Sequence, residues 1–250
     1  MAGHSKWANI KRQKARVDAK KGKNFTQLAR AIIVAARQGA DPLGNFQLRT
    51  AIDKAKALGI PNENIERAIA KGAGTYANDT PLEEIRYEGY GVGGVAIIIE
   101  ALTDNRNRTA ADLRAAFSKN GGNLGETGCV SWMFSQKGVI YLAGSLDEER
   151  ILETCLEGGA DTYEMLEDEQ GVEVFTDIPN LDKLSNFLQS QGLPVKEIEF
   201  RWIPSTMVEV TDGEQARFLL KLIDALESLD DVQSVTANFD LAEDLLVWSA

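Results

Sequence analysis

The chain has 250 residues, of which 44% are hydrophobic and 26% are charged, and its formal net charge is −11. This length and composition are typical of a water-soluble protein that buries more than one hydrophobic core. No apolar run approaches the roughly 18 residues that a transmembrane helix requires, so we expect no membrane-spanning segment.

The N-terminus and the cysteines bear on processing and location. Basic residues begin the chain, but no hydrophobic region follows them, so a secretory signal is not indicated; a basic, acid-poor start is also typical of a transit peptide. Cys129 and Cys155 match no metal-binding or redox spacing. We therefore expect free thiols, a reducing compartment and a cytoplasmic location.

Positive charge is concentrated at the N-terminus. Residues 1–30 carry a net charge of +8, residues 1–76 carry +10, and residues 77–250 carry −21. Lysines and arginines displace counterions from a phosphate backbone, and an aromatic ring offers a stacking face to an exposed base. The candidate nucleic-acid-binding residues are His4, Lys6, Trp7, Lys11, Arg12, Lys14, Arg16, Lys20, Lys21, Lys23 and Arg30. The alternative is that residues 1–23, called the basic arm below, only make the protein more soluble.

Residues 24–74 show a helical pattern of apolar side chains. The first helix is predicted to begin with Asn24 as its N-cap and to end at Gly39. The second is predicted over residues 45–58 and ends before Pro61. The third is predicted over residues 62–72. Three short helices with tight connections indicate a small bundle, and its exposed basic side chains would extend the positive surface of the arm.

Strand-like patterns begin after residue 81. Strands are predicted at residues 84–88 and 95–102, a helix at 109–119, and a strand at 129–134. Gly89 to Gly94 match G-x-G-x-x-G, but a dinucleotide site requires these glycines between a strand and a helix. Here they lie between two strands, so we predict a hairpin. Arg106 and Arg108 are predicted on a loop, where they are weak candidates for a functional site.

Residues 135–204 have the element order β-α-β-β-α-β, which is typical of a ferredoxin-like unit. The segments before and after it would then combine into a second α+β sandwich. The predicted fold class is α+β, with an N-terminal three-helix domain followed by two ferredoxin-like domains, one inserted in the other. The predicted domains are residues 1–76, residues 77–134 with 205–250, and the insert at 135–204.

The insert is strongly acidic, because residues 146–200 carry a net charge of −12. This charge argues against RNA binding by the sheet of the insert, which also lacks recognisable paired aromatics. Two interpretations remain: a solvated surface, or a docking face for a basic protein partner.

Signatures of catalysis are absent from the sequence. The single histidine, His4, excludes most histidine triads and multi-histidine metal sites, and no P-loop, nucleophile elbow or H-E-x-x-H occurs. Acidic clusters fall on predicted turns and helix starts, where solvation explains them. We therefore expect a protein that is not an enzyme and has no metal site and no cofactor.

Several segments together resemble the YebC family. They are the opening MAGHSKWANIK, the basic run to Lys23, GIPN at 59–62, YEGYG at 87–91, TDNR at 103–106, GGNLG at 121–125 and VSWMF at 130–134. The resemblance covers essentially the whole chain. It implies a three-domain protein with a helical domain and two α+β domains, one inserted in the other. Members are described as probable DNA-binding transcriptional regulators, as a mitochondrial translational activator of cytochrome oxidase, and as ribosome-associated factors.

Three functions are therefore weighed. A DNA-binding transcriptional regulator would hold duplex phosphates with the arm and bundle, although no predicted helix shows a base-reading face. A ribosome-associated translation factor would bind ribosomal RNA through the arm, and its acidic body would stay away from the RNA or contact basic ribosomal proteins. A protein-interaction scaffold would make little use of the arm. The expected partners are DNA or ribosomal RNA, and with the second function the ribosome.

Overall fold

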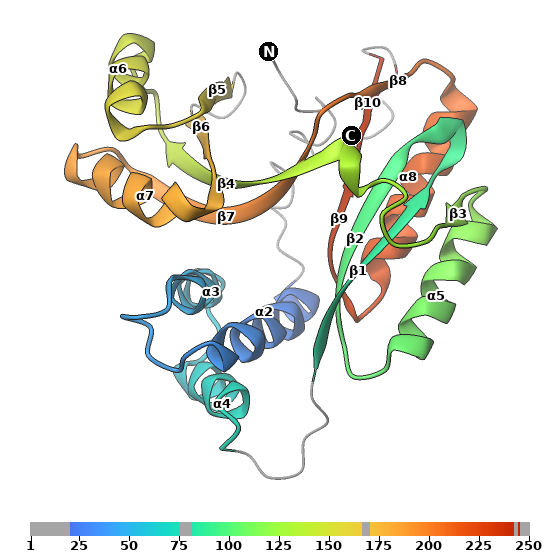
Figure 1. The fold of residues 1–250 in the computed structure, drawn as a ribbon, viewed down its shortest axis with the longest axis horizontal. Helices are drawn as coiled ribbons and strands as arrows, with labels where there is room; N and C mark the ends of the chain where they lie inside the picture. Colours follow the sequence, from blue (N-terminus) through green and yellow to red (C-terminus); the bar gives the residue numbers. More distant parts are fainter. Residues whose placement is uncertain (1–20, 76–81, 167–170, 243–244, 246–250) are drawn as a thin grey trace. The chain divides into compact units, whose positions relative to one another are not determined.

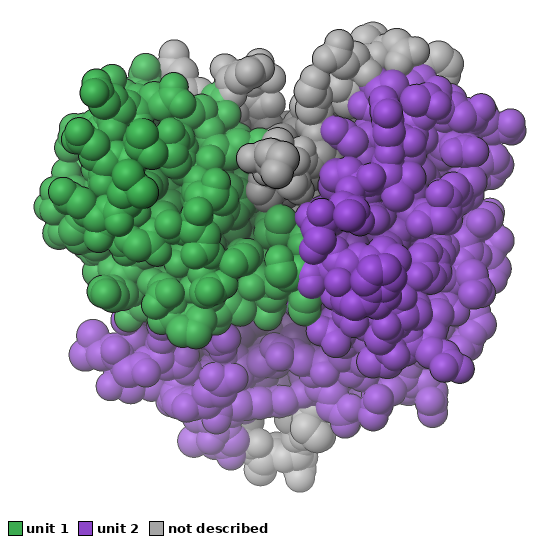
Figure 2. Space-filling model, turned by 45° about the horizontal axis from the view of Figure 1, so that its top comes forward, with its two compact units in different colours: residues 1–2, 135–203 green, residues 3–134, 204–250 purple. Residues whose placement is uncertain are grey.

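The structure is a computed structural model, and it describes residues 21–75, 82–166, 171–242 and 245. Within these ranges none of the helices combines the length and apolar character needed to cross a bilayer. The chain folds into two compact units (Figure 2): Ser135–Ile203 forms one, and the described residues before and after this segment form the other. The two units are described separately below.

Three helices make up the N-terminal part of the larger unit (Figure 1): α2 (Lys21–Arg37), α3 (Phe46–Ala57) and α4 (Asn62–Gly72). Apolar residues at helical spacing fill the space between them, with Ile32, Leu48 and Ile65 almost fully buried. The predicted N-terminal helical domain is confirmed, but the predicted start of its first helix is wrong. Asn24 lies inside α2, which already includes Lys21, because an N-cap signal is only local and lysine is a good helix former.

The second helix begins where the sequence indicates. Asn45 is its N-cap: the side-chain oxygen accepts a hydrogen bond from Leu48 N–H at 3.0 Å. The Asn45 amide also donates to the carbonyls of Ala35 and Gly39 at 2.7 and 2.8 Å. One buried side chain therefore caps α3 and satisfies carbonyls at the end of α2.

A four-stranded sheet forms the rest of this unit. Its strands are β1 (Glu83–Tyr90), β2 (Ala96–Thr103), β3 (Asn123–Leu124) and β9 (Val232–Ala237), in the order β3-β1-β2-β9. α5 (Arg106–Lys119) and α8 (Gly213–Ser228) cover one face (Figure 1). β8 (Val208–Val210) and β10 (Phe239–Leu241) form a separate parallel pair. The chain before the insert thus supplies β2, and the chain after it supplies the antiparallel partner β9.

The glycine-rich segment after β1 is the predicted hairpin. β1 and β2 pair antiparallel from Glu83↔Thr103 to Tyr90↔Ala96, and a 3₁₀ turn at Val92–Gly94 joins them. Gly93 and Gly94 each have φ +75°, a conformation that glycine adopts without strain. The dinucleotide interpretation therefore fails on geometry, as predicted, because the glycines lead into β2 and not into an α-helix.

Two element predictions in this unit are wrong. The strand predicted at residues 129–134 is absent over 129–133: a 3₁₀ turn at Ser131–Met133 comes first, and strand β4 (Phe134–Ala143) begins only at the last predicted residue. Two backbone N–H groups of this segment, those of Val130 and Ser131, bond to a carboxylate that is described below. Arg106 and Arg108 do not lie on a loop, because α5 begins at Arg106.

The smaller unit contains β4, α6 (Glu148–Gly158), β5 (Thr162–Leu166), β6 (Gly171–Thr176), a 3₁₀ turn at Ile178–Asn180, α7 (Leu181–Ser190) and β7 (Val195–Pro204). Its strand order, β5-β6-β4-β7, is that of the predicted ferredoxin-like unit. The strand order of the four-stranded sheet in the larger unit, β3-β1-β2-β9, differs from this ferredoxin-like order. The α+β fold class is confirmed.

Candidate nucleic-acid interface

Most of the predicted binding residues lie outside the described part of the chain. His4, Lys6, Trp7, Lys11, Arg12, Lys14, Arg16 and Lys20 all belong to residues 1–20. Lys21 and Lys23 lie in the first turn of α2, and Arg30 follows in the same helix. Arg30 is the one predicted site residue whose side-chain contacts are described.

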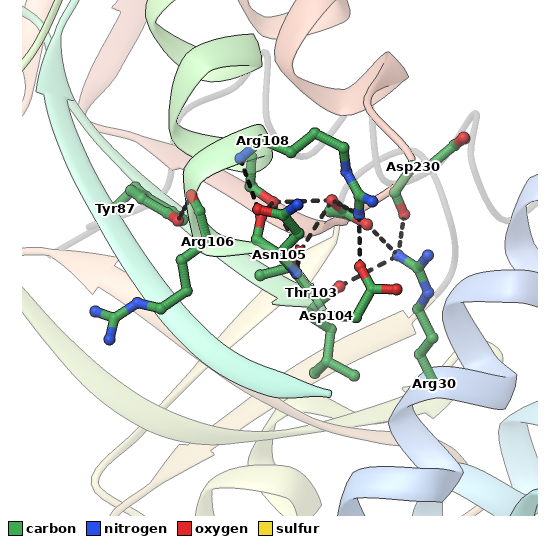
Figure 3. A network of polar contacts seen from close by, with 11 residues as sticks. Arg30, Tyr87, Thr103, Asp104, Asn105, Arg106, Arg108 and Asp230 are labelled. Atoms are coloured by element: carbon green, nitrogen blue, oxygen red, sulfur yellow. Dashed lines mark hydrogen bonds and ion pairs between the residues drawn. The ribbon is translucent and has the colours of Figure 1, made fainter. Parts of the chain in front are cut away.

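The guanidinium of Arg30 points toward the loop between α8 and β9 (Figure 3). Its Nη1 donates to Asp231 Oδ1 at 2.9 Å, to the Asp230 carbonyl at 2.7 Å and to the Leu102 carbonyl at 3.2 Å. These contacts give Arg30 a structural role that the sequence did not indicate. Contact between Arg30 and nucleic acid stays a prediction.

Asp231 is the centre of this network. Its second oxygen, Oδ2, accepts hydrogen bonds from Arg108 Nη2 at 2.7 Å, Thr109 Oγ1 at 2.8 Å and Thr103 Oγ1 at 3.1 Å. Desolvation raises the pKa of a buried carboxyl, but here the hydrogen bonds from Arg108 and Thr109 outweigh it, and the pKa of Asp231 lies below its usual value. The carboxylate is therefore charged at neutral pH and holds two arginines.

The first turn of α5 lies next to this carboxylate. Asn105 caps the helix by accepting a hydrogen bond from Arg108 N–H at 3.1 Å. The Arg108 guanidinium also contacts Asp104 at 2.9 Å, whereas the Arg106 side chain is well exposed. The sequence contains a signal for this helix start, because asparagine is a favoured N-cap residue and Asn105 directly precedes Arg106.

Two further side chains of α2 bond to the sheet of the larger unit and to the residue that precedes β1. Gln27 Nε2 donates to the Val232 carbonyl at 2.6 Å, and Arg37 Nη1 donates to the Leu82 carbonyl. Leu82 and Leu102 also belong to the apolar core of the helices. Helix α2, whose first three residues are the end of the basic arm, is thus attached to the sheet by polar and apolar contacts.

These contacts reduce the free positive charge of the helices. Arg30 and Arg37 bond to the sheet and its connections, and Arg67 pairs with Glu63 at 2.8 Å. The exposed faces of α3 and α4 also carry the acids Asp53, Glu63 and Glu66. The bundle therefore adds less positive surface than its lysines and arginines suggest.

A second polar cluster, which the sequence did not indicate, lies around Glu88. This carboxylate is almost fully buried and accepts hydrogen bonds from the backbone N–H groups of Gly128, Val130 and Ser131 at 2.8–3.0 Å. Desolvation opposes the charge, but these bonds dominate and keep the pKa of Glu88 below its usual value. The loop from Gly128 to Ser131 is thereby fixed around a negative charge.

Trp132, which follows this loop, is 72% exposed, and its indole Nε1–H donates to the Cys129 carbonyl at 3.1 Å. In the part of the chain that the structure describes, no three His, Cys, Asp or Glu side chains are arranged to hold a metal ion.

Family models match nearly the whole chain. The model described as the TACO1/YebC protein N-terminal domain matches residues 5–75, and the model of the TACO1/YebC second and third domain matches residues 82–239. The chain belongs to the TACO1/YebC family. The resemblance stated from the sequence motifs is thereby confirmed.

Relatives within the TACO1/YebC family carry a regulatory name. A probable transcriptional regulatory protein of Gloeothece citriformis is 75% identical over 250 residues, covering 98% of both chains. One from Microcystis aeruginosa is 73% identical over 251 residues, covering 99% of both chains. The crystal structure of a conserved hypothetical protein from Aquifex aeolicus has a TM-score of 0.83 at 45% identity, covering 92% of this chain and 94% of that one.

Proposed function

We propose that this protein is a non-enzymatic regulator of gene expression that binds nucleic acid through its basic arm. The observation that carries the proposal is the separation of charge: +10 on residues 1–76 against −21 on residues 77–250. A polyanion is attracted to the first segment and repelled by the second, so the arm is where binding is favourable. The names of the relatives from Gloeothece citriformis and Microcystis aeruginosa support a regulatory role.

The attachment of α2 supports the same proposal. Gln27 and Arg30 bond to residues 230–232, so the helix that follows the arm has a defined place beside the sheet. A polyanion held by the arm would therefore be connected to a helix that has a fixed position in the larger unit.

Two nucleic acids are candidates, duplex DNA and ribosomal RNA. The relatives' names favour DNA. The mixed charges on α3 and α4 favour the second candidate function, a ribosome-associated translation factor, because a base-reading helix presents Arg, Asn or Gln on one exposed face. The arm instead combines cations with Trp7 and His4, which suits stacking on unpaired bases.

Co-sedimentation with purified ribosomes tests both candidates. The protein is sedimented with ribosomes at about 0.15 M salt, where weak polyanion binding is screened, with and without excess duplex DNA. Retention on the ribosome in the presence of DNA assigns translation, and displacement by DNA assigns transcription. The variant lacking residues 2–20 keeps all of α2 and is expected to bind neither. Unchanged binding by this variant would refute the role of the arm.

A further inference from the structure

Helix α6 of the acidic insert exposes two leucines. Leu152 and Leu156 are 44% and 71% exposed, while Ile151 and Cys155 of the same helix are buried. Residues four apart lie on one face of a helix, so the two leucines form one apolar strip that faces away from the core.

Acidic side chains surround this strip. Glu148 lies on one side of it and Glu149 and Glu153 on the other, and all three are exposed. Glu149, Glu153 and Glu157 follow one another at intervals of four residues, and like charges at this spacing destabilise a helix. Glu157 is also near the C-terminus of α6, where the helix dipole disfavours an anion. A local pattern that opposes folding is typical of a functional surface.

Three cations of the same unit are engaged away from this face. Arg150 Nη2 donates to the Gln191 carbonyl at 2.9 Å, and Lys137 binds Asp161 and Asp177 at 2.8 and 2.7 Å. Arg201 is buried against Glu173 and Glu199. The one cation of α6 itself, Arg150, is therefore directed to the Gln191 carbonyl, and its side chain is not paired with the glutamates of the outer face by any described ion pair.

We infer that the outer face of α6 docks a basic segment of a partner protein. The face consists of Glu148, Glu149, Leu152, Glu153, Leu156 and Glu157. Its chemistry fits an amphipathic helix that places an aliphatic side chain on the leucine strip and lysines or arginines against the glutamates. Nucleic acid is repelled by the same charges. This docking is independent of the basic arm, so the protein would connect a nucleic acid to a basic protein.

The probe for this face is a labelled synthetic amphipathic helix of leucine and lysine, about 18 residues long, which gives about five turns. Its binding to the full-length protein is followed by fluorescence anisotropy at about 0.15 M salt. Leu152→Ser with Leu156→Ser, and separately Glu149→Gln with Glu153→Gln and Glu157→Gln, are each expected to weaken binding about tenfold or more. The chain without residues 2–20 is expected to bind the probe as the full chain does, which separates this test from that of the arm.

Matched controls lie outside the insert. Leu43→Ser removes another exposed leucine, and Glu126→Gln with Glu209→Gln and Asp224→Asn removes the same number of exposed charges. Both controls are expected to bind the probe normally. Equal weakening by the controls, or normal binding by the double serine variant, would overturn the inference. Sedimentation could instead show a dimer of the parent protein that becomes a monomer in the double serine variant. That result would assign the face to a second copy of this chain and would also overturn the inference.

Thermal unfolding adds a readout that a purely structural role does not predict. The triple glutamine variant on α6 removes like-charge repulsion, so its melting temperature is expected to equal or exceed that of the parent protein while its affinity for the probe falls. A lower melting temperature together with lost binding would mean that the glutamates stabilise α6, contrary to the inference.

Discussion

Asp231 shows how one side chain can connect segments that are far apart in sequence. It lies in the loop before β9 and accepts hydrogen bonds from Arg30 of α2 and from Arg108 and Thr109 of α5. Arg30 was predicted from its charge to face nucleic acid, and its described contacts are with the protein itself. The sequence does not indicate which anion a given cation will pair with. Residues 30 and 231 come together only when the chain folds.

Replacement of Asp231 by asparagine is expected to lower the free energy of unfolding by about 2 kcal/mol, because Arg30 and Arg108 lose their shared anion while Arg108 stays half in solvent. Urea denaturation at pH 7 measures this loss. Asp230→Asn is the control, since Asp230 contributes its backbone carbonyl to Arg30. Equal losses in both variants would show that the side chain of Asp231 is not the source.

The pH dependence of stability follows from the sign of the shift. The pKa of Asp231 is lowered in the folded state, so its stabilisation is complete above the unfolded carboxyl pKa of about 4 and is lost as the pH falls through the lower folded value. The Asp231→Asn variant is expected to lose less stability than the parent between pH 5 and pH 2 (approximate limits). Parallel curves for the two proteins would contradict this assignment.

Glu88 and Cys129 provide a second prediction for single residues. Burial first, and then the charge of Glu88, raises the pKa of Cys129. Glu88→Gln removes that charge and part of the carboxylate's capacity to accept hydrogen bonds, so the loop is expected to open and Cys129 to react faster with a thiol reagent at pH 8. Cys155, whose pKa burial raises to about 11, serves as the internal reference. An unchanged Cys129 rate would mean that Glu88 does not hold the loop.

At the scale of elements, α2 and α4 approach closely at Gly72. A Cβ atom at this position would lie 2.7 Å from the Ala36 Cβ and would also overlap the Ile33 carbonyl oxygen. The sequence indicates Gly72 only as a helix stop. Its second role, as the contact surface between two helices, becomes visible only when they are packed.

Gly72→Ala is therefore expected to separate α2 from α4 and to destabilise the protein by about 1–3 kcal/mol, the usual cost of overpacking. Gly44→Ala is the matched control, because its Cβ would meet no heavy atom within 4 Å and its φ is not positive. Thermal unfolding of both variants distinguishes crowding at Gly72 from a general effect of alanine. Equal melting temperatures would refute the close contact.

At the scale of the whole molecule, charge separation predicts how nucleic-acid binding depends on salt. Lys11→Gln with Lys14→Gln is expected to reduce the slope of log K against log salt concentration by between one and two, since each phosphate contact contributes about 0.7–0.9. Lys183→Gln with Lys196→Gln, in the acidic insert, is expected to leave the slope unchanged. Equal effects of both pairs would show that binding depends on net charge and not on the arm.

The sequence by itself determined the α+β class, the three helices, the hairpin at Gly89–Gly94 and the order of elements in the insert. These features depend on apolar periodicity, glycine and proline, which act within a few residues. It also determined the family, through motifs that run along most of the chain.

Tertiary structure alone decided the rest. Residues 129–133 have a strand-like pattern, but they lie in a bend and a 3₁₀ turn, where Val130 and Ser131 donate their backbone N–H groups to Glu88. Tertiary packing likewise directed Arg30 toward Asp231 and left Leu152 and Leu156 of α6 in solvent. The physical reason is the same in all three cases. Whether a side chain finds a partner depends on residues far away in the sequence, and a local sequence pattern contains no information about them.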